Sequence, residues 1–272
     1  MNTAYPELRL GTSSWSSTDW VGKFYAPGTA TRDFIAAYAR TFNSVEIDAT
    51  FYAVPRRSTI EGWRDRTPPD FVFAAKAPQR ITHEKFLVNA ESDLNEFLEA
   101  MSILGPRLGP ILFQFPYYAR ASGVTRDEFL RRLEAFLPKL PSGGQYAVEV
   151  RNKSWIGKTL LAMLHNAKIP LALIDHPWMS PPGELFARDG VLTGPFAYIR
   201  WLGDRYKMEQ MTRTWNETLV DREADLQRWV PHILGLLERR FPIFAYVNNH
   251  YAGYAPGTVE LLNGLIHDAQ TR

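Results

Sequence analysis

Short runs of β-branched and aromatic residues recur along the chain, and glycine and proline residues separate them. Runs of this kind are typical of strands. The pattern predicts eight strands, over residues 8–15, 44–51, 71–78, 110–116, 146–151, 170–176, 196–203 and 243–250.

Between most of these runs, apolar residues recur three and four positions apart, which is the period of a helix. Thr31 is placed to cap one helix, and Thr125 with Glu128 forms a capping box before another. Further helices are predicted around residues 58–66, 94–101, 160–164, 229–237 and 259–266. Prolines and glycines interrupt any helical pattern in residues 177–195, which predicts an irregular sixth crossover.

Strands that alternate with helices predict parallel pairing, because a parallel connection needs a crossover of a dozen or more residues. Eight such units favour an α/β fold of the (β/α)8 TIM-barrel type, and a doubly wound open sheet is the alternative. Since no linker or charge block divides the chain, we expect residues 1–272 to form a single domain.

Composition narrows the class of protein. Of the 272 residues, 45% are hydrophobic and 22% are charged, which is typical of a folded globular domain. The formal net charge is only +2, so any basic site must be local. The absence of cysteine excludes disulfides, thiolate catalysis and Cys-based metal sites. No apolar run is long enough to span a bilayer, so we expect no membrane partner and a cytoplasmic location.

Polar side chains gather at the carboxyl ends of the predicted strands, where parallel α/β folds bind their ligands. Glu46 with Asp48, and Glu149 with Arg151, each share one face of a strand because strand side chains alternate. The candidates for catalysis are Glu46, Lys76, Glu149 and Asp175. The candidates for substrate binding are Trp15, Asp48, Tyr52, His83, Gln114, Arg151, Arg200, Asn248 and Asn249. The alternative is that Glu46, Lys76, Glu149 and Arg200 merely neutralise one another inside a polar interior.

Many short segments, in order through nearly the whole chain, resemble one known family. They include Gly11-Thr12-Ser13 with Trp15, Val45-Glu46-Ile47 with Phe51-Tyr52, Lys76 with Thr82-His83, Phe113-Gln114-Phe115-Pro116, Val148-Glu149-Val150-Arg151, Asp175, Ile199-Arg200-Trp201 and Asn248-Asn249. The sequence is similar to the YecE-like proteins, grouped as domain of unknown function 72. The resemblance implies a TIM-barrel-like fold and supplies no reaction. Asp48 stands where relatives often have Asn, and Tyr117 stands where they often have a second Pro.

Several common catalytic motifs are incomplete or absent in the sequence. Gly157-Lys158-Thr159 resembles the end of a phosphate-binding loop, but Asn152 stands where that loop needs its first glycine. The chain contains neither a dinucleotide-binding glycine motif nor a nucleophile elbow. His176 and His250 fall at strand ends beside the carboxylates, yet the cations of the same ring would repel a metal ion. We therefore expect no metal and no other cofactor, with a divalent metal as the less favoured alternative.

A basic and aromatic rim is predicted around the same strand ends. Loop cations contribute to it, namely Arg56, Arg57, Arg80, Lys85, Lys153, Arg205 and Lys207. Aromatic residues accompany them, namely Trp15, Trp20, Phe24, Tyr25, Tyr52 and Trp201. Such a rim suits phosphates, carboxylates and stacked bases, but solvated charges and core aromatics have the same composition.

Three functions are consistent with these residues. The favoured one is an acid/base or hydrolytic enzyme acting on an anionic small molecule, phosphorylated or carboxylated. The alternatives are a nucleic-acid-binding or nucleic-acid-processing protein and a non-catalytic metabolite sensor. The segment 204–219 after the seventh strand is expected either to close over the ligand through Arg205 or Lys207 or to be a static loop.

Overall fold

Strands and helices alternate along the chain, and the computed structural model describes residues 5–271. In this range the strands are β1 (Leu8–Thr12), β2 (Ser44–Ile47), β3 (Val72–Lys76), β4 (Leu108–Gln114), β5 (Tyr146–Glu149), β6 (Ala172–Asp175), β7 (Ala197–Trp201) and β8 (Ile243–Val247). The α-helices are α1 (Phe34–Tyr38), α2 (Arg57–Asp65), α3 (Glu91–Met101), α4 (Arg126–Phe136), α5 (Lys158–Asn166), α6 (Pro182–Phe186), α7 (Arg205–Met211), α8 (Glu223–Gln227), α9 (Val230–Glu238) and α10 (Ala255–Gln270).

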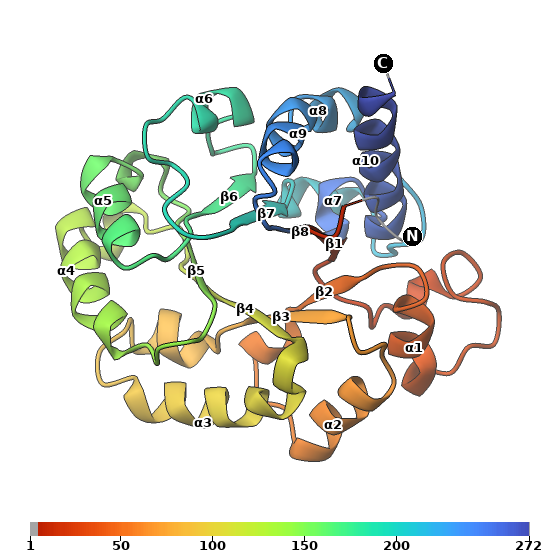
Figure 1. Ribbon diagram of the computed structural model, residues 1–272, viewed down its shortest axis with the longest axis horizontal. Coiled ribbons are helices and arrows are strands. Elements are labelled where there is room, and N and C mark those ends of the chain that lie inside the picture. The colour runs from red at the N-terminus through yellow and green to blue at the C-terminus, as the bar shows by residue number, and fades with distance from the viewer. Residues whose placement is uncertain (1–4, 272) are drawn as a thin grey trace.

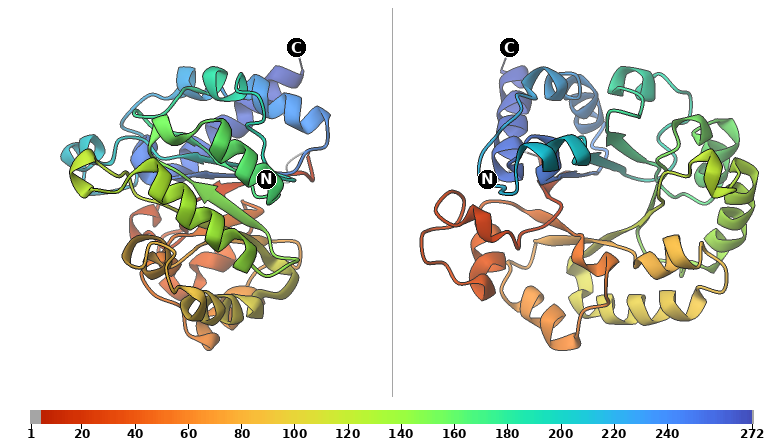
Figure 2. Two further views of the ribbon diagram at one scale, coloured as in Figure 1. Left: turned by 90° about the vertical axis from the view of Figure 1, so that its left-hand side faces the viewer. Right: turned by 180° about the vertical axis from the view of Figure 1, so that it is seen from behind.

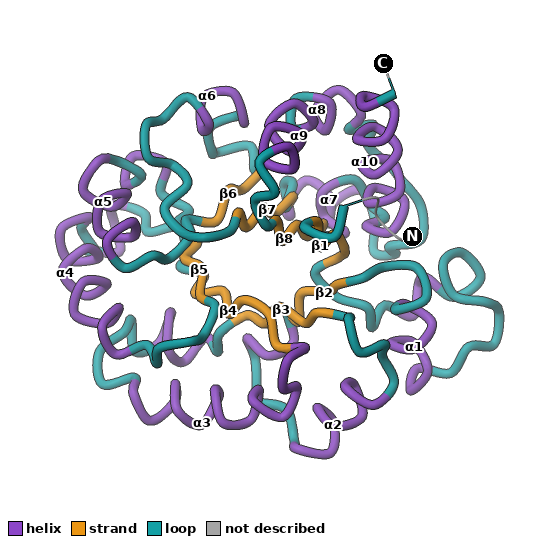
Figure 3. The backbone as a smooth tube through the Cα atoms, in the orientation of Figure 1, coloured by secondary structure: helices purple, strands orange, loops and turns teal. Residues whose placement is uncertain are grey.

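All strand pairs are parallel within the described range, and they form two four-stranded sheets. One sheet has the order β2-β3-β4-β5 and the other has the order β1-β8-β7-β6. The pairing of β1 with β8 differs from a doubly wound sheet, in which the strand order reverses. The strands surround a common centre and the helices lie outside them (Figures 1 and 3). Figure 2 shows the same arrangement from the side and from behind.

Side chains connect β1 to β2, the neighbouring strands of the two sheets. The hydroxyl of Tyr38 accepts hydrogen bonds from the amide of Thr12 at 2.8 Å and from its side chain at 2.9 Å. The same hydroxyl donates to the carbonyl of Ser44 at 3.1 Å. Asn43 bridges the same strands, because its amide accepts from Leu10 N at 3.2 Å and donates to the carbonyl of Leu8 at 2.9 Å.

The sheets also approach each other between β5 and β6. The amide of Val148 donates to the carbonyl of Pro170 at 2.9 Å, and Val148 forms a parallel bridge with Leu171. The amide of Leu171 is bound in turn by the hydroxyl of Thr193 at 2.7 Å. Contacts between the sheets therefore occur at both pairs of sheet edges.

Two apolar clusters fill the structure. The larger lies between the strands and the helices and contains most of the buried aliphatic and aromatic residues. The smaller joins side chains from both sheets on the inner faces of the strands, namely Ala74, Leu112, Ala147, Ala172, Phe196, Tyr198, Phe244 and Tyr246. The inner face is apolar over these residues, so it is a packed core.

The predicted strands are all present, but each ends earlier than the sequence pattern predicted. β2 stops at Ile47, and the backbone turns helical at Asp48, with φ −77° and ψ −23°. Thr31 was expected to cap a helix, but it begins a 3-10 turn and makes no capping hydrogen bond. Thr125 does cap α4, since its side chain accepts from the amide of Glu128 at 3.2 Å.

The crossover after β6 contains the five-residue helix α6. The segment after β7 begins with α7, whose first turn is capped by the side chain of Asp204 at the amide of Lys207. Further along, the ring of Trp215 lies 4.7 Å from that of His250. Residues 204–219 are therefore in part a capped helix, where the sequence predicted a loop. Among the described residues, no helix combines the length and apolar character needed to cross a membrane.

Candidate functional site

A buried ion cluster lies at the carboxyl ends of β2, β5 and β7. The guanidinium of Arg200 donates from Nη2 to Oε1 of Glu46 at 2.7 Å, from Nε to the same oxygen at 3.2 Å, and from Nη1 to Oε2 of Glu149. Arg200 is 2% exposed, and both glutamates are 0% exposed. The hydroxyl of Tyr198 donates to the other oxygen of Glu46 at 2.6 Å. We call these four residues the Arg200 cluster.

The register of the strands explains why these residues meet. Tyr198 pairs with Ala172, and Arg200 pairs with Ile174 and Tyr246. Since side chains alternate along a strand, Arg200 continues the inner face on which Tyr198 packs. Sequence reasoning missed Tyr198, although its position two residues before Arg200 is the signal that would have found it.

Arg151 joins the Arg200 cluster to the surface. Its Nε donates to Oε1 of Glu149 at 2.8 Å, and its side chain is about one-third exposed. Although burial alone raises the pKa of Glu149, the cations Arg200 and Arg151 outweigh it and lower that pKa to about 2. Glu149 is therefore a carboxylate with both oxygens bound.

Lys76 and Asp48 form a second ion pair beside the cluster. Nζ of Lys76 lies 3.2 Å from Oδ1 of Asp48 and 3.8 Å from the centre of the Phe51 ring. Lys76 is 7% exposed. Burial lowers the pKa of Lys76, Asp48 raises it, and nearby Arg200 lowers it further, with a net decrease. An ammonium in this position loses its proton more easily than an exposed lysine does.

His83 approaches the same ion pair from a π-helical turn, Arg80–Glu84. Its Nδ1 is 2.8 Å from the hydroxyl of Thr82, and its ring lies 4.9 Å from that of Phe51. Burial, followed by the charges of Lys76 and Arg151, lowers the pKa of His83 to about 4. The ring is therefore neutral at pH 7.

Three of the other predicted binding residues lie in three different settings. Gln114 is buried and pairs in register with Glu149, with its amide donating to the carbonyl of Phe115 at 2.6 Å. Tyr52 is exposed, next to Phe51. Trp15 instead packs in the outer core, where its ring lies 5.2 Å from that of Trp63.

Asp175 lies apart from the Arg200 cluster. It pairs with Trp201 in register, so it is on the opposite face from Arg200. Its carboxylate accepts from Nε1 of Trp229 at 2.7 Å and from the hydroxyl of Tyr251 at 3.3 Å. Burial raises its pKa. Asp175 borders a separate cavity of about 270 Å³.

Asn248 and Asn249 fix the backbone after β8. Oδ1 of Asn248 accepts from the amide of His250 at 3.0 Å and lies 2.6 Å from Nδ1 of the His250 ring. Oδ1 of Asn249 accepts from the amide of Ala255, the first residue of α10, at 3.0 Å. Asn248 and Asn249 border a cavity of about 120 Å³, which Asp48 also lines.

Two buried polar atoms of residues that line this small cavity have neither a hydrogen-bond partner nor an ion-pair partner within the described part of the chain. They are Oγ of Ser13 and Nε1 of Trp20. The two residues are 3% and 1% exposed, respectively. Unpaired buried polar atoms are costly, so this cavity offers hydrogen bonds to a small polar group.

Metal binding has little support from the side chains. Within residues 5–271, no group of three or more His, Cys, Asp or Glu side chains is arranged to hold a metal ion. The carboxylates at the centre are bound by cations instead.

Comparisons with known proteins agree with the resemblance. The UPF0759 protein YecE of Escherichia coli K12 is 34% identical over 173 residues, which cover 62% of this chain and 59% of YecE. The match thus spans less than two-thirds of that relative. The UPF0759 protein YunF of Bacillus subtilis is 28% identical over 272 residues, covering 91% of this chain and 90% of YunF.

Solved structures support the same fold. A DUF72 family protein of Thermotoga maritima has a TM-score of 0.73 and 24% identity, covering 97% of this chain and 99% of its own. A DUF72 family protein of Enterococcus faecalis has a TM-score of 0.71 and 19% identity, covering 95% of both chains. The family model described as "Protein of unknown function DUF72" matches residues 9–272. The chain therefore belongs to the DUF72 family, whose curated relatives include YecE and YunF.

Proposed function

We propose that the protein is an enzyme that moves a proton on a small anionic molecule, in which Lys76 is the acid/base group. The observation that carries the proposal is the position of Lys76. Its ammonium is nearly buried at the end of an inner strand face, 3.2 Å from a carboxylate and with a lowered pKa. A lysine placed in this way gives up its proton more readily than an exposed lysine does, which favours a role in acid/base catalysis.

The charges around Lys76 suit an anionic substrate. Arg151 uses Nε to bind Glu149 and is about one-third exposed, so its outer edge can receive a carboxylate or a phosphate. His83 is neutral and lies near Lys76 and Arg151, where it can donate or accept a hydrogen bond. In the proposed reaction, the Nζ lone pair of neutral Lys76 takes a proton from the substrate, the electrons of the broken bond stay on the substrate, and the Asp48 carboxylate stabilises the resulting ammonium.

The Arg200 cluster has a supporting role in this proposal. Glu46 and Glu149 are 0% exposed, and the oxygens of both are occupied by Arg200, Tyr198 and Arg151. A carboxylate with no exposed oxygen is poorly placed to exchange a proton with a substrate. We therefore assign Glu46 and Glu149 to positioning Arg200 and Arg151. Asp175 belongs to a separate cavity and takes no part in the proposed reaction.

We also propose that the two sheets together form the wall of a (β/α)8 barrel. The side-chain bridges between β1 and β2 and the backbone bridge between β5 and β6 support this arrangement. A barrel would place the ends of all strands around one mouth, which is the position of active sites in such folds. A crystal structure in which Tyr38 bridges no strands would contradict it.

Proton transfer can be tested without knowing the product. The protein is incubated in D2O with a panel of phosphorylated and carboxylated metabolites, and NMR measures the loss of substrate protons and any product formed. We expect exchange or turnover of at least one compound, and a loss of at least about 100-fold in Lys76→Met, in line with typical acid/base contributions.

Lys23→Met is the matched control, because Lys23 is exposed and belongs neither to the Arg200 cluster nor to the ion pair of Lys76 with Asp48. It should leave the rate unchanged. The proposal fails if no compound in the panel exchanges or reacts, or if Lys76→Met is as active as the unchanged protein.

A further inference from the structure

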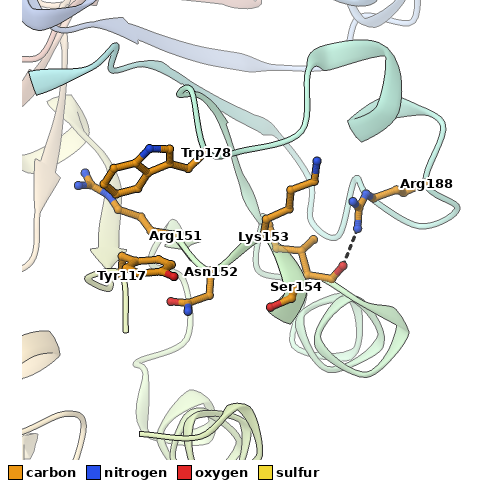
Figure 4. A pocket seen from close by; sticks show the side chains of 8 residues that line it. Tyr117, Arg151, Asn152, Lys153, Ser154, Trp178 and Arg188 are labelled. Atoms are coloured by element: carbon orange, nitrogen blue, oxygen red, sulfur yellow. Dashed lines mark hydrogen bonds between the residues drawn. The ribbon is translucent and has the colours of Figure 1, made fainter. Parts of the chain in front are cut away.

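A cavity of about 780 Å³ lies beside the Arg200 cluster, at the ends of β4, β5 and β6 (Figure 4). Tyr117 follows β4, Arg151 and Lys153 follow β5, and Trp178 follows β6. The volume falls within the range of about 300–1,000 Å³ that is usual for small-molecule sites. We call it the Trp178 pocket. Arg151 and Lys153 were expected around an anionic ligand, whereas Trp178 and Arg188 were not among the predicted site residues.

One side of the Trp178 pocket carries two aromatic rings, with the side chain of Arg151 beside them (Figure 4). The rings of Tyr117 and Trp178 lie 5.7 Å apart at an interplanar angle of 60°. Both are large and exposed, at 52% and 55% respectively. Trp178 is held by a turn in which its amide donates to Nδ1 of His176 at 3.2 Å. Exposed aromatic rings on a fixed backbone are a surface on which a planar ligand can stack.

The other side of the pocket is cationic. Arg188 is fixed by hydrogen bonds from Nη1 to the carbonyl of Ile156 at 2.6 Å and from Nη2 to Oγ of Ser180 at 3.1 Å. Lys153 is near Glu184, at 3.4 Å, but both side chains are about half exposed, so water weakens this pair. Figure 4 shows Lys153 and Arg188 on the side of the pocket away from Trp178 and Tyr117.

We propose that the Trp178 pocket binds a nucleotide, with its base against Trp178 and Tyr117 and its phosphate at Lys153 and Arg188. A free anion would leave the exposed rings without a partner, and an uncharged aromatic compound would leave the cations without one. A nucleotide has a planar base and a phosphate separated by a sugar, so it matches both sides of the pocket. The proposal concerns binding and does not depend on the proton transfer proposed above.

Asn152, which also lines the pocket, bears on whether the site distinguishes one base from another. Both polar atoms of the Asn152 amide are engaged by the backbone of Tyr118, at 2.9 Å each. These bonds fix the orientation of Asn152, which is only 7% exposed, so we expect it to shape the pocket more than to read the edge of a base. Stacking then dominates, so purine and pyrimidine nucleotides should both bind, the purines more tightly because their rings are larger.

The test is calorimetric titration of the whole chain with a nucleoside 5′-monophosphate, the corresponding nucleoside and ribose 5-phosphate. We expect the nucleotide to bind roughly tenfold more tightly than either fragment, because each fragment keeps one of the two contacts. A short single-stranded oligonucleotide, titrated in parallel, identifies the source of the nucleotide. Tighter binding of the oligonucleotide indicates a strand, and equal or weaker binding indicates the free compound.

Variants place the ligand in this pocket. Trp178→Ala should weaken the nucleotide and the nucleoside by about tenfold each, whereas Lys153→Ala should weaken the nucleotide alone. The matched controls are Tyr206→Ala, which removes another exposed aromatic ring, and Lys23→Ala, which removes another exposed cation. Circular dichroism checks that each variant is folded.

Three results would overturn the proposal. They are the absence of saturable binding of any nucleotide, ribose 5-phosphate binding as tightly as the nucleotide, and equal losses in Trp178→Ala and Tyr206→Ala. Lys76→Met separates this proposal from the proposed reaction. It should abolish proton transfer and leave nucleotide binding unchanged, and a loss of binding in this variant would place the nucleotide at Lys76 instead.

Discussion

Arg200 and Glu46 are 154 positions apart in the chain, yet Nη2 of the first lies 2.7 Å from Oε1 of the second in a part of the interior that is almost sealed from water. Glu149 occupies the opposite side of the same guanidinium. The single positive charge of Arg200 does not neutralise two carboxylates. Arg151 supplies a second positive charge at Glu149. The arrangement is thus a chain of charges that runs from the interior to the surface.

Removal of the central cation should be highly destabilising. Arg200→Met leaves Glu46 and Glu149 buried without their main partner, so we expect a loss of about 3–5 kcal/mol in the free energy of unfolding. Urea denaturation followed by circular dichroism measures it. Arg205→Met, which breaks an exposed pair with Glu209, should change the midpoint little. Equal midpoints for the two variants would contradict the buried role of Arg200.

Acid should destabilise the protein partly through Glu149. The pKa of this carboxyl is lowered to about 2 in the folded protein, below its ordinary value of 4.5. Its stabilising contribution is therefore complete above about pH 5 and is lost as the pH falls towards 2. In Glu149→Gln, the free energy of unfolding should be lower at pH 7 and should depend less on pH between 5 and 3. An unchanged slope would show that Glu149 does not titrate with folding.

The hydroxyl of Tyr38 should stabilise the contact between β1 and β2. Tyr38→Phe leaves the buried amide of Thr12 and the carbonyl of Ser44 without this partner, and we expect a cost of about 1–3 kcal/mol. Amide hydrogen exchange gives the local readout, since the Thr12 amide should exchange faster than in the unchanged protein. Equal protection of that amide in both proteins would rule out the bridge.

The proton affinity of Lys76 should depend on Asp48. The Asp48 carboxylate raises the pKa of Lys76 against the lowering effect of burial. Asp48→Asn removes the negative charge and keeps the shape, so the pKa of Lys76 should fall further. NMR titration of the Lys76 side chain with a carbon-13 label measures it. A pKa that rises, or one equal to that of exposed lysines in both proteins, would contradict the proposed site.

The cap of α4 allows a prediction at a site far from the charges. Thr125→Ala removes the oxygen that binds the amide of Glu128, and the free energy of unfolding should fall by about 1 kcal/mol. Thr125→Ser keeps the oxygen and should be close to the unchanged protein. Thermal or urea denaturation of the two variants compares them directly, and equal losses would exclude the capping role.

Periodicity predicted the order of the elements because the strands are rich in aliphatic and aromatic residues, and because helical patterns lie between most of them. Strand ends were harder to predict. A polar residue such as Asp48 can either extend the strand or begin a helical turn. Its type does not decide between the two, and the helical turn is selected by tertiary contacts. Thr31 was mispredicted as a helix cap for a similar reason. A capping residue needs a particular backbone geometry, and residue type alone does not determine it.

The alternation of side chains along a strand correctly predicted that Glu149 and Arg151 lie together. It could not predict whether Asp175 lies on the same face as Arg200. Two side chains on different strands share a face only if the register between the strands is known, and Asp175 pairs with Trp201. The Trp178 pocket was missed for a related reason. Its parts come from three connections after β4, β5 and β6, each of which reads in sequence as an ordinary loop.

The division of the charges between the sheets has a consequence for folding. Glu46 and Glu149 belong to the sheet β2-β3-β4-β5, whereas Arg200 belongs to the sheet β1-β8-β7-β6. Before the sheets meet, Glu46 lacks Arg200 and Glu149 has only Arg151 as a partner, while Arg200 lies among apolar residues and tyrosines without a carboxylate. The two sheets are therefore complementary in charge where they meet. When the sheets dock in the correct alignment, Arg200 neutralises the buried carboxylates. A misaligned docking would leave a charge buried without a partner, which is unfavourable.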